Sequence, residues 1–179
     1  LREAGIPTAR GLVYRKPESR NISFAKTMRT LGLPMFVKPA NMGSSIGVSK
    51  VTNEKEFKAA LTEAFRYDSK VVVEEGIVGR EIECAVLGTQ APKASLPGEV
   101  IAQKDFYSYD AKYVSADGAI LKIPAELPKA TVMKIQKAAL KAYGAMGCEG
   151  LARVDFFLKS NGELIVNEIN TVPGFVAGV

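Results

Sequence analysis

The residues best suited to chemistry lie in one segment near the end of the chain. Among the residues from 153 to 170 are Arg153, Asp155, Glu168 and Asn170. Carboxylate and amide oxygens are ligands that hard divalent cations such as Mg²⁺ prefer. These residue types therefore predict a Mg²⁺ site with an arginine beside it, provided that the backbone brings them together.

A β-hairpin would bring them together. Asn161-Gly162 is a dipeptide that strongly favours a tight turn, and it separates two runs of alternating apolar residues. With these two residues as the loop, the predicted cross-strand pairs are Asp155–Glu168, Arg153–Asn170 and Phe157–Val166. Directly opposed acids destabilise a sheet unless a positive group lies between them, which supports a cation site. Because side chains alternate along a strand, the other face would carry Val154, Phe156, Ile165 and Ile169.

A second candidate site is the segment 38–47, in which a predicted strand carrying Lys38 opens into a turn rich in glycine and serine. Glycines let the backbone approach a ligand closely, and consecutive backbone amides can bind an anion. Lys38 adds a positive charge for a phosphate, and Ser44 and Ser45 lie in the turn. The alternative is an ordinary hairpin with an exposed lysine. The residue order of a P-loop is absent.

A third candidate is the segment 71–81, which runs from an apolar strand into Glu74 and Glu75 and then to Ile77 and Glu81. Backbone groups that follow a strand can bind an adenine edge, and a carboxylate suits ribose hydroxyls. The alternative is an ordinary strand–turn–strand unit with solvated acids.

A fourth candidate is the segment 104–118, which is dense in aromatic and charged residues and is flanked by predicted strands. Such a loop could be a lid that excludes water from a reacting phosphate. The alternative is a surface loop with packed tyrosines.

The composition excludes several classes of function. The net charge is +5, but lysines and arginines are scattered, which argues against nucleic acid and fits a phosphate-bearing small molecule. The absence of histidine excludes a Ser-His-Asp triad, a Cys-His pair and a His-ligated zinc centre. Cys84 and Cys148 predict reduced, buried thiols of a cytoplasmic protein. No apolar run approaches the roughly 20 residues that span a bilayer, so no membrane association is expected.

The hydrophobic pattern mixes strands and helices without regular βαβ alternation, which favours an α+β fold over a doubly wound sheet. Strands are predicted at 11–14, 35–39, 48–51, 71–75, 81–87, 99–103 and 120–123, in addition to the hairpin. Helices are predicted at 24–32, after a capping-box-like start at Asn53 and Glu56, and from Pro128 to about Gly147.

The motifs occur in the order KPANMGSSIG, VVVEEGIVGREIECAVLG, FYSYDAKY, GLARVDFFL and NEINTVPGF. This order resembles the D-alanine–D-alanine ligase family of the ATP-grasp superfamily over essentially the whole chain. The resemblance implies an ATP-grasp fold, in which two α+β subdomains grip ATP between them. It covers only the central and C-terminal subdomains, expected at residues 1–73 and 74–179. One departure is Val176, where the family usually has threonine.

The resemblance also implies roles for individual residues. Nucleotide binding would involve Lys38 and Ser45 at the phosphates, Glu74, Glu75 and Ile77 at or beside adenine, Glu81 at the ribose and Lys112 at the γ-phosphate. Two Mg²⁺ ions, with Mn²⁺ as a substitute, would be held by Asp155, Glu168 and Asn170. Catalysis would involve Arg153 and the Gly174 backbone as oxyanion donors, Ser44 over the phosphates and Tyr113 in the closing lid.

The activity that the resemblance implies is the ATP-dependent joining of two D-alanine molecules through an acyl phosphate, for peptidoglycan precursor synthesis. The parent enzyme is expected to be a cytoplasmic homodimer. An alternative is a D-alanine–D-serine ligase. A D-lactate ligase is disfavoured, because those relatives place a histidine in the lid and this chain has none. A further alternative is a non-catalytic nucleotide-binding module, and the chain alone is expected to be inactive without the family's N-terminal domain.

Overall fold

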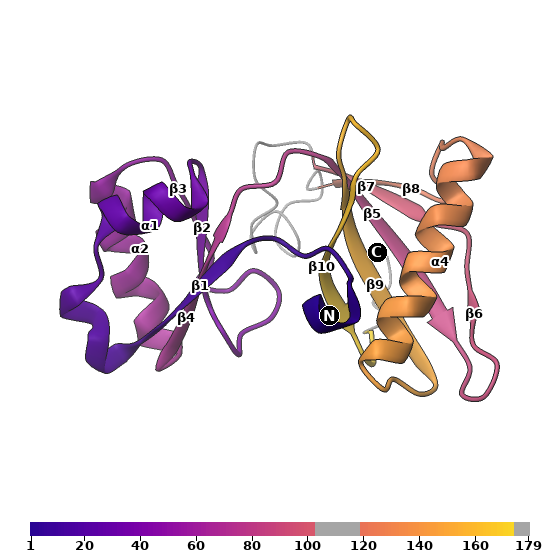
Figure 1. Ribbon diagram of the computed structural model, residues 1–179, viewed down its shortest axis with the longest axis horizontal. Coiled ribbons are helices and arrows are strands. Elements are labelled where there is room, and N and C mark those ends of the chain that lie inside the picture. The colour runs from indigo at the N-terminus through magenta and orange to yellow at the C-terminus, as the bar shows by residue number, and fades with distance from the viewer. Residues whose placement is uncertain (103–118, 174–179) are drawn as a thin grey trace. The chain divides into compact units, whose positions relative to one another are not determined.

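The computed structural model describes residues 1–102 and 119–173 of the chain (Figure 1). Its backbone separates into two compact units. The Lys38 unit contains Ala9–Gly76, and the Arg153 unit contains Leu1–Thr8, Ile77–Ile101 and the chain from Ile120 onward. The sequence prediction instead divides the chain between residues 73 and 74, and assigns the first residues to the first subdomain.

The first eight residues belong to the Arg153 unit because they pack onto its sheet. The backbone N–H of Val166 donates to the Pro7 carbonyl at 2.9 Å, and Thr8 forms a parallel bridge with Val166. Ile6 is buried in the hydrophobic core of the same unit. A short 3₁₀ helix, η1 (Arg2–Ala4), precedes these contacts.

The Lys38 unit is a four-stranded sheet in the order β1-β4-β2-β3, with every neighbouring pair antiparallel. Its strands are β1 (Gly11–Arg15), β2 (Met35–Pro39), β3 (Ser49–Val51) and β4 (Lys70–Glu75). Buried and less buried residues alternate along β2 and β4, so Met35, Val37, Val71 and Val73 face the core. Lys38 and Glu74 are consequently on the opposite face.

Helices α1 (Phe24–Leu31) and α2 (Glu54–Tyr67) contribute to the same core (Figure 1). A 3₁₀ helix, η2 (Lys16–Asn21), occupies a stretch without a predicted element. The predicted cap of α2 is confirmed: Asn53 Oδ1 accepts from the Glu56 N–H at 3.0 Å, and Glu56 Oε2 accepts from the Thr52 N–H at 2.7 Å. The hydrogen bonds from Thr52 lower the pKa of Glu56.

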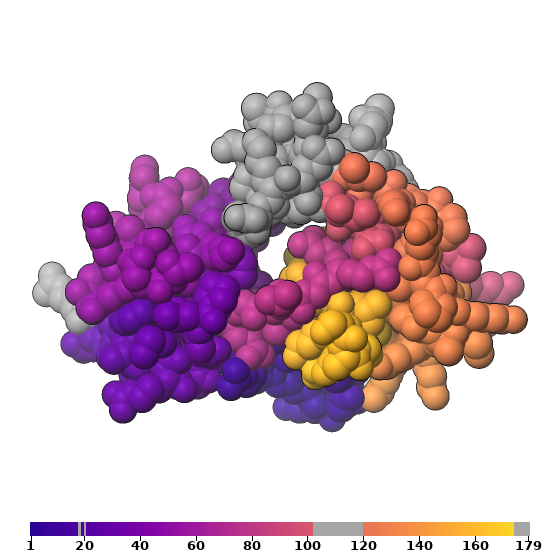
Figure 2. Space-filling model, turned by 90° about the horizontal axis from the view of Figure 1, so that it is seen from above, coloured from indigo at the N-terminus to yellow at the C-terminus, as the bar shows by residue number. Residues whose placement is uncertain are grey.

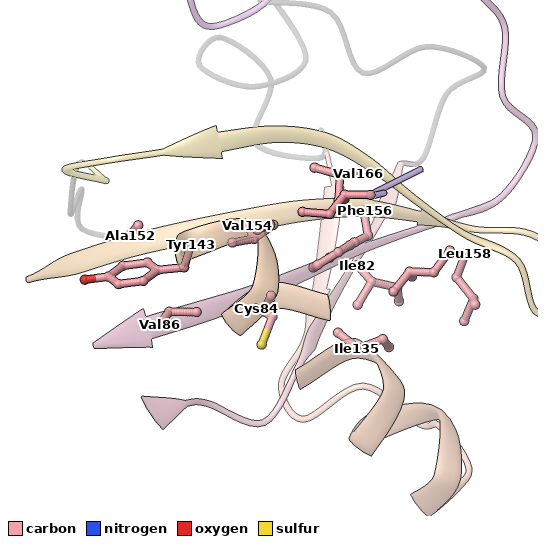
Figure 3. Close-up of a cluster of buried hydrophobic side chains, with 14 of the residues drawn as sticks. Ile82, Cys84, Val86, Ile135, Tyr143, Ala152, Val154, Phe156, Leu158 and Val166 are labelled. Carbon is pink, nitrogen blue, oxygen red and sulfur yellow. The ribbon is translucent and has the colours of Figure 1, made fainter. Parts of the chain in front are cut away.

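The described part of the Arg153 unit contains a six-stranded sheet in the order β10-β9-β5-β7-β8, with β6 paired to β5. Its strands are β5 (Arg80–Leu87), β6 (Lys93–Ala94), β7 (Gly98–Ala102), β8 (Ala119–Lys122), β9 (Leu151–Leu158) and β10 (Leu164–Asn170). Helix α4 (Lys129–Ala145) packs against one face. Figure 3 shows this core, with Ile82 and Cys84 from β5, Val154 and Phe156 from β9, and Ile135 from α4.

The hairpin of β9 and β10 confirms two predicted pairs and corrects a third. Asp155 pairs with Glu168 and Arg153 with Asn170, as predicted, but Phe157 pairs with Ile165 and not with Val166. The loop is one residue longer than the sequence suggested, because the Lys159 N–H donates to the Glu163 carbonyl and the Gly162 N–H to the Lys159 carbonyl, both at 2.9 Å.

A β-bulge between Val166 and Glu168 then compensates for the longer loop. The prediction that Ile165 shares a face with Val154 and Phe156 is therefore wrong. Ile165 lies on the face of Phe157, while Leu164 and Val166 join the core. The bulge shifts the alternation by one residue, so that Glu168 returns to the face of Asp155.

The α+β prediction is confirmed, and every predicted strand and helix is present within two residues of its predicted ends. The elements β6, η1 and η2 were not predicted, because each is only two to six residues long. No helix in the described ranges is long and apolar enough to cross a membrane.

Candidate functional site

One face of the sheet in the Arg153 unit carries a row of three acids. Glu83 of β5 pairs with Asp155 of β9, and Asp155 pairs with Glu168 of β10. The next row contains Ala85, Arg153 and Asn170. This face is opposite to the one that α4 covers, because Ile82, Cys84 and Val154 between these positions are buried in the core. Both strands thus project their polar residues away from the hydrophobic core.

Arg153 is bound to the central acid by two parallel hydrogen bonds. Its Nε donates to Asp155 Oδ1 at 2.7 Å, and its Nη2 donates to Asp155 Oδ2 at 2.8 Å. Glu83 Oε2 lies 3.4 Å from Arg153 Nε. The hydrogen bonds to Asp155 are the largest cause of a raised pKa of Arg153, with Glu83 and Glu168 adding to it and burial opposing it. Arg153 is therefore a fixed positive charge.

The acid row can accept a cation, although it does not require one. Arg153 already supplies positive charge next to Asp155, so the opposed acids alone are not proof of a metal. Asn170 Nδ2 donates to Asp155 Oδ2 at 2.9 Å, and Glu168 is exposed. In Figure 2, the yellow part of the chain, which belongs to the hairpin of β9 and β10, is seen at the surface.

The donor set fits Mg²⁺ that arrives with a nucleotide. Within the described ranges, no group of three or more histidine, cysteine, aspartate or glutamate side chains is arranged to hold a metal alone. Asp155, Glu168 and the Asn170 amide offer two carboxylates and one carbonyl. Mg²⁺ is usually held by one or two carboxylates, with phosphate oxygens and waters completing its shell. These residues therefore suit a shared Mg²⁺–phosphate site.

Glu81, the predicted ribose ligand, lies on the same face of the sheet. It pairs with Phe157, two residues along β5 from Glu83. Ile77 lies in the short segment between β4 and β5 and is half-buried. Gly79 in this segment lies close to β9, because a Cβ there would be 2.9 Å from the Leu158 carbonyl oxygen.

In the Lys38 unit, the predicted phosphate lysine and the predicted adenine acid are in contact. Lys38 Nζ lies 2.6 Å from Glu74 Oε2, and both side chains are partly exposed. Gly11 of β1 pairs with Glu74 on its other side. A Cβ at Gly11 would lie 3.1 Å from Glu74 Cγ, so the absence of a side chain there gives Glu74 its room. The sequence analysis gave no reason to select Gly11.

Glu75 forms an ion pair with Arg10, a residue that was not predicted to belong to the site. Its Oε1 accepts from the Arg10 N–H at 2.8 Å and its Oε2 from Arg10 Nε at 2.7 Å. Arg10 Nη1 donates to the Thr30 carbonyl near the end of α1 at 3.1 Å. The hydrogen bond to Glu75 raises the pKa of Arg10. The Glu75–Arg10 pair thus connects the end of β4 to the residue before β1 and, through Arg10, to the end of α1.

Ser44 and Ser45 have a strained backbone. Their φ angles are +54° and +61°, and the Ile46 N–H donates to the Gly43 carbonyl at 3.1 Å. A turn with both central residues at positive φ normally selects glycine or asparagine. Serine at both positions indicates that the hydroxyls or the loop shape have a use besides stability.

Three predicted residues, Lys112, Tyr113 and Gly174, lie outside the described residues. The described residues of the prediction fall into two groups, one on each unit. Lys38, Glu74 and the Ser44–Ser45 turn belong to the Lys38 unit, and Glu81, Arg153, Asp155, Glu168 and Asn170 share one sheet face of the Arg153 unit. Glu83 is the residue on that face that the sequence analysis missed, although its alternation with Glu81 could have placed it there.

A hollow of about 460 Å³ in the Arg153 unit contains none of the predicted site residues. It is lined by Arg80, Thr131 and Lys159, among others. Arg80 is bound there to Glu99, with Nε and Nη2 each donating at 2.6 Å to one carboxylate oxygen.

Comparison with known proteins identifies the family of the chain. The family model described as D-ala D-ala ligase C-terminus matches residues 1–178. The chain is 55% identical over 175 residues to a D-alanine–D-alanine ligase of Oceanobacillus iheyensis, which covers 98% of the chain and 48% of that protein. It is 51% identical, with the same coverage, to D-alanine–D-alanine ligase A of Escherichia coli K12.

Solved structures give the same result. The D-alanine–D-alanine ligase of Coxiella burnetii has a TM-score of 0.84 at 38% identity, over 99% of this chain and 46% of that one. The VanG D-Ala:D-Ser ligase of Enterococcus faecalis has a TM-score of 0.87 at 35% identity, over 99% of this chain and 51% of that one. The chain spans about half the length of the curated relatives that it matches. It belongs to the family of D-alanine–D-alanine ligase C-terminal regions, with the ATP-grasp fold of these ligases.

Proposed function

We propose that this chain forms the nucleotide- and Mg²⁺-binding part of an ATP-dependent ligase that joins two D-alanine molecules. The observation that carries the proposal is the sheet face on which Arg153 and Asp155 stand opposite Asn170 and Glu168. It unites a fixed positive charge with a donor set suited to Mg²⁺. Family membership adds the ligase chemistry, and ATP and divalent metal use follow from the family.

The proposed nucleotide-binding residues are those that the sequence predicts, and each unit contains some of them. In the Lys38 unit, Lys38 binds phosphate oxygens as a point charge, Ser44 and Ser45 cover the phosphates, and Glu74 binds the adenine amine. The ion pair between Lys38 Nζ and Glu74 Oε2, at 2.6 Å, keeps both side chains oriented before a ligand binds. Glu75, also in the Lys38 unit, would lie beside the adenine. In the Arg153 unit, Glu81 would accept from the ribose, and the Ile77 backbone would meet the adenine edge.

The metal would be held by Asp155, Glu168 and Asn170, with Mn²⁺ as a substitute for Mg²⁺. Two ions are the proposed number. Bound Mg²⁺ neutralises phosphate charge, which is the main requirement of phosphoryl transfer besides positioning. The Asn170 amide can rotate to present its oxygen, because the nitrogen that now donates to Asp155 is on the same planar group.

The reaction would proceed in two steps. A carboxylate oxygen of the first D-alanine attacks the γ-phosphorus, the bond to ADP breaks, and an acyl phosphate forms. The amine of the second D-alanine then attacks the acyl carbon, and the C–O bond to phosphate breaks with loss of the amine proton to solvent. Arg153, with the Gly174 backbone, stabilises the oxyanion of the second step. Lys112 would neutralise the γ-phosphate, and Tyr113 would help to close the lid.

A second candidate is the joining of D-alanine to D-serine. It is supported by the similarity to the D-Ala:D-Ser ligase of Enterococcus faecalis, with a TM-score of 0.87. The identities of 49 to 55% to D-alanine–D-alanine ligases favour D-alanine as the second substrate.

The test is phosphate release by a full-length hybrid, in which this chain replaces the segment that it matches in the Oceanobacillus iheyensis ligase. D-alanine, D-serine and D-lactate are supplied separately and in pairs with D-alanine, and products are identified by mass. Release of phosphate with D-alanyl-D-alanine as product is expected. Mg²⁺-dependent nucleotide binding without turnover on any substrate would instead favour a non-catalytic nucleotide-binding module.

A further inference from the structure

The guanidinium of Arg153 has two carboxylate neighbours from two different strands. Asp155, on the same strand, accepts from both Nε and Nη2. Glu83, on β5, approaches the same Nε to 3.4 Å. The Arg153 and Glu83 side chains are each about one-third exposed, at 33% and 31%, whereas the Asp155 side chain is 13% exposed. Asp155 is thus the inner partner of Arg153 and Glu83 the outer one.

The register explains how Glu83 reaches Arg153. The residue directly opposite Arg153 on β5 is Ala85, and Glu83 is opposite Asp155. A methyl group at position 85 leaves space on the sheet surface for the arginine to bend toward the acid row. Diagonal neighbours on adjacent strands are within the reach of long side chains, so Arg153 can contact Asp155 and Glu83 together.

The Asp155 carboxylate oxygens accept hydrogen bonds and would also bind the proposed Mg²⁺. Its Oδ1 accepts from Arg153, and its Oδ2 accepts from both Arg153 and Asn170. A cation bound at Asp155 draws on the same lone pairs and repels the guanidinium. An arginine that relied on Asp155 alone would loosen when the cation arrives, which is when an oxyanion donor must be in place.

We propose that Glu83 is a positioning residue that keeps the Arg153 guanidinium in place when Asp155 binds Mg²⁺. This inference rests on the proposed function, because it requires Mg²⁺ at Asp155. Glu83 acts through Arg153 and touches neither metal nor substrate. Its carboxylate accepts the Nε–H that Asp155 partly gives up, so that the arginine changes partner without changing place.

The direct test is NMR of the Arg153 Nε–H group in the 179-residue chain, assigned with the Arg153→Lys variant. Exchange of this proton with water is measured without ligand and with Mg²⁺ and ADP. We expect slow exchange in both states for the natural sequence. In Glu83→Gln, exchange should remain slow without ligand and become about tenfold faster with Mg²⁺ and ADP, since a charge-assisted hydrogen bond is lost. The matched control is Glu163→Gln, a paired acid at the far end of the same hairpin, which should behave as the natural sequence does.

Turnover of the hybrid gives the second readout. Glu83→Gln should lower kcat about tenfold with the KM for ATP within about twofold, because misplacement of an oxyanion donor affects the transition state and not nucleotide binding. Glu163→Gln should leave both unchanged.

The outcomes separate the two proposals. Unchanged Arg153 exchange in Glu83→Gln, while Mg²⁺ and ADP shift the Asn170 amide signals, would overturn the role of Glu83 and leave the metal site standing. Faster exchange of equal size with and without ligand would also overturn it, because Glu83 would then be an ordinary structural partner. Absence of any shift at Asn170 with Mg²⁺ and ADP would overturn the metal site and the inference together.

Discussion

Glu168 lies opposite Asp155 because one extra residue, Asn167, is inserted between Glu168 and the buried Val166. Without this bulge in the present sequence, a strict alternation would direct Glu168 to the face of Val166, into the core. The bulge therefore brings an exposed acid of β10 beside the nearly buried acid of β9. Bulges that redirect a side chain are frequent next to active sites.

Replacement of Glu168 by glutamine should weaken Mg²⁺-dependent ADP binding by about tenfold or more, because a carboxylate ligand of a hard cation is lost. Titration of the chain with ADP at fixed Mg²⁺ measures this effect. Glu63→Gln on α2, which removes an acid paired with Arg66, is the matched control and should change binding less than twofold. Equal effects of the two substitutions would contradict the metal site.

Gly11→Ala should weaken nucleotide binding with a small effect on folding. The added Cβ would lie 3.1 Å from Glu74 Cγ, so the flexible Glu74 side chain must move and its ion pair with Lys38 is disturbed. We expect about tenfold weaker ADP binding, which corresponds to the loss of one charge-assisted interaction. Unchanged affinity would show that the placement of Glu74 against Gly11 has no part in the nucleotide site.

The control for Gly11→Ala is Gly144→Ala in α4, where an added Cβ meets no atom within 4 Å. This substitution should raise the free energy of unfolding by about 0.5–1 kcal/mol, because alanine has a higher helix propensity than glycine. Nucleotide affinity should not change. Chemical denaturation and ADP titration of both variants separate an effect on the site from an effect on the fold.

Ser45→Gly should stabilise the fold and weaken nucleotide binding. Glycine removes the strain of a positive φ, here +61°, which should raise the free energy of unfolding by about 0.5–1 kcal/mol. Ser45→Ala also loses the hydroxyl but keeps the strain, so it should weaken ADP binding equally without the gain in stability. Denaturation and titration of the two variants test this, and tighter or unchanged binding in both would contradict a phosphate role for the hydroxyl.

The Arg80–Glu99 pair should make stability depend on pH in the acid range. The hydrogen bonds from Arg80 lower the pKa of Glu99 below its ordinary value of 4.5. A carboxylate with a depressed folded-state pKa stabilises the fold above the unfolded pKa, and this contribution is lost as the pH falls through the folded-state pKa.

Glu99→Gln should consequently lower the free energy of unfolding by about 1–2 kcal/mol at pH 7, since the buried Glu99 carboxylate loses its charged hydrogen bonds to the more exposed Arg80 side chain. The difference between the two proteins should shrink as the pH falls below about 4. Urea unfolding at pH 7 and at pH 3 measures both values. A difference that is constant with pH would show that the charge of Glu99 is not the cause.

The sequence predicted most of the fold because the strong signals are local. Apolar periodicity located the strands and helices, and Asn53 with Glu56 located the start of α2. The Asp155–Glu168 pair was predicted correctly although the loop and the Phe157 pair were not. The longer loop shifts the strand pairing by one residue, and the bulge shifts it back, so the pairs beyond Val166 are those predicted. Neither the longer loop nor the bulge can be recognised from the alternation of apolar residues.

The remaining contacts depend on tertiary register, which a single sequence does not encode in its spacing. Gly11 faces Glu74 and Arg10 binds Glu75 only because β1 and β4, about 60 residues apart in the chain, pair in one register. Glu83 meets Arg153 for the same reason, across β5 and β9. Such partners emerge when the sheet order is known.

The central claim, an acyl phosphate route to a D-alanine dipeptide, is tested most directly by isotope transfer. The full-length hybrid is supplied with ATP, Mg²⁺ and D-alanine labelled with ¹⁸O in both carboxylate oxygens, and the released phosphate is analysed by mass. We predict one ¹⁸O atom in each phosphate and D-alanyl-D-alanine as the organic product, because the attacking carboxylate oxygen leaves with the phosphate. Phosphate without ¹⁸O, released with or without dipeptide, would contradict the account.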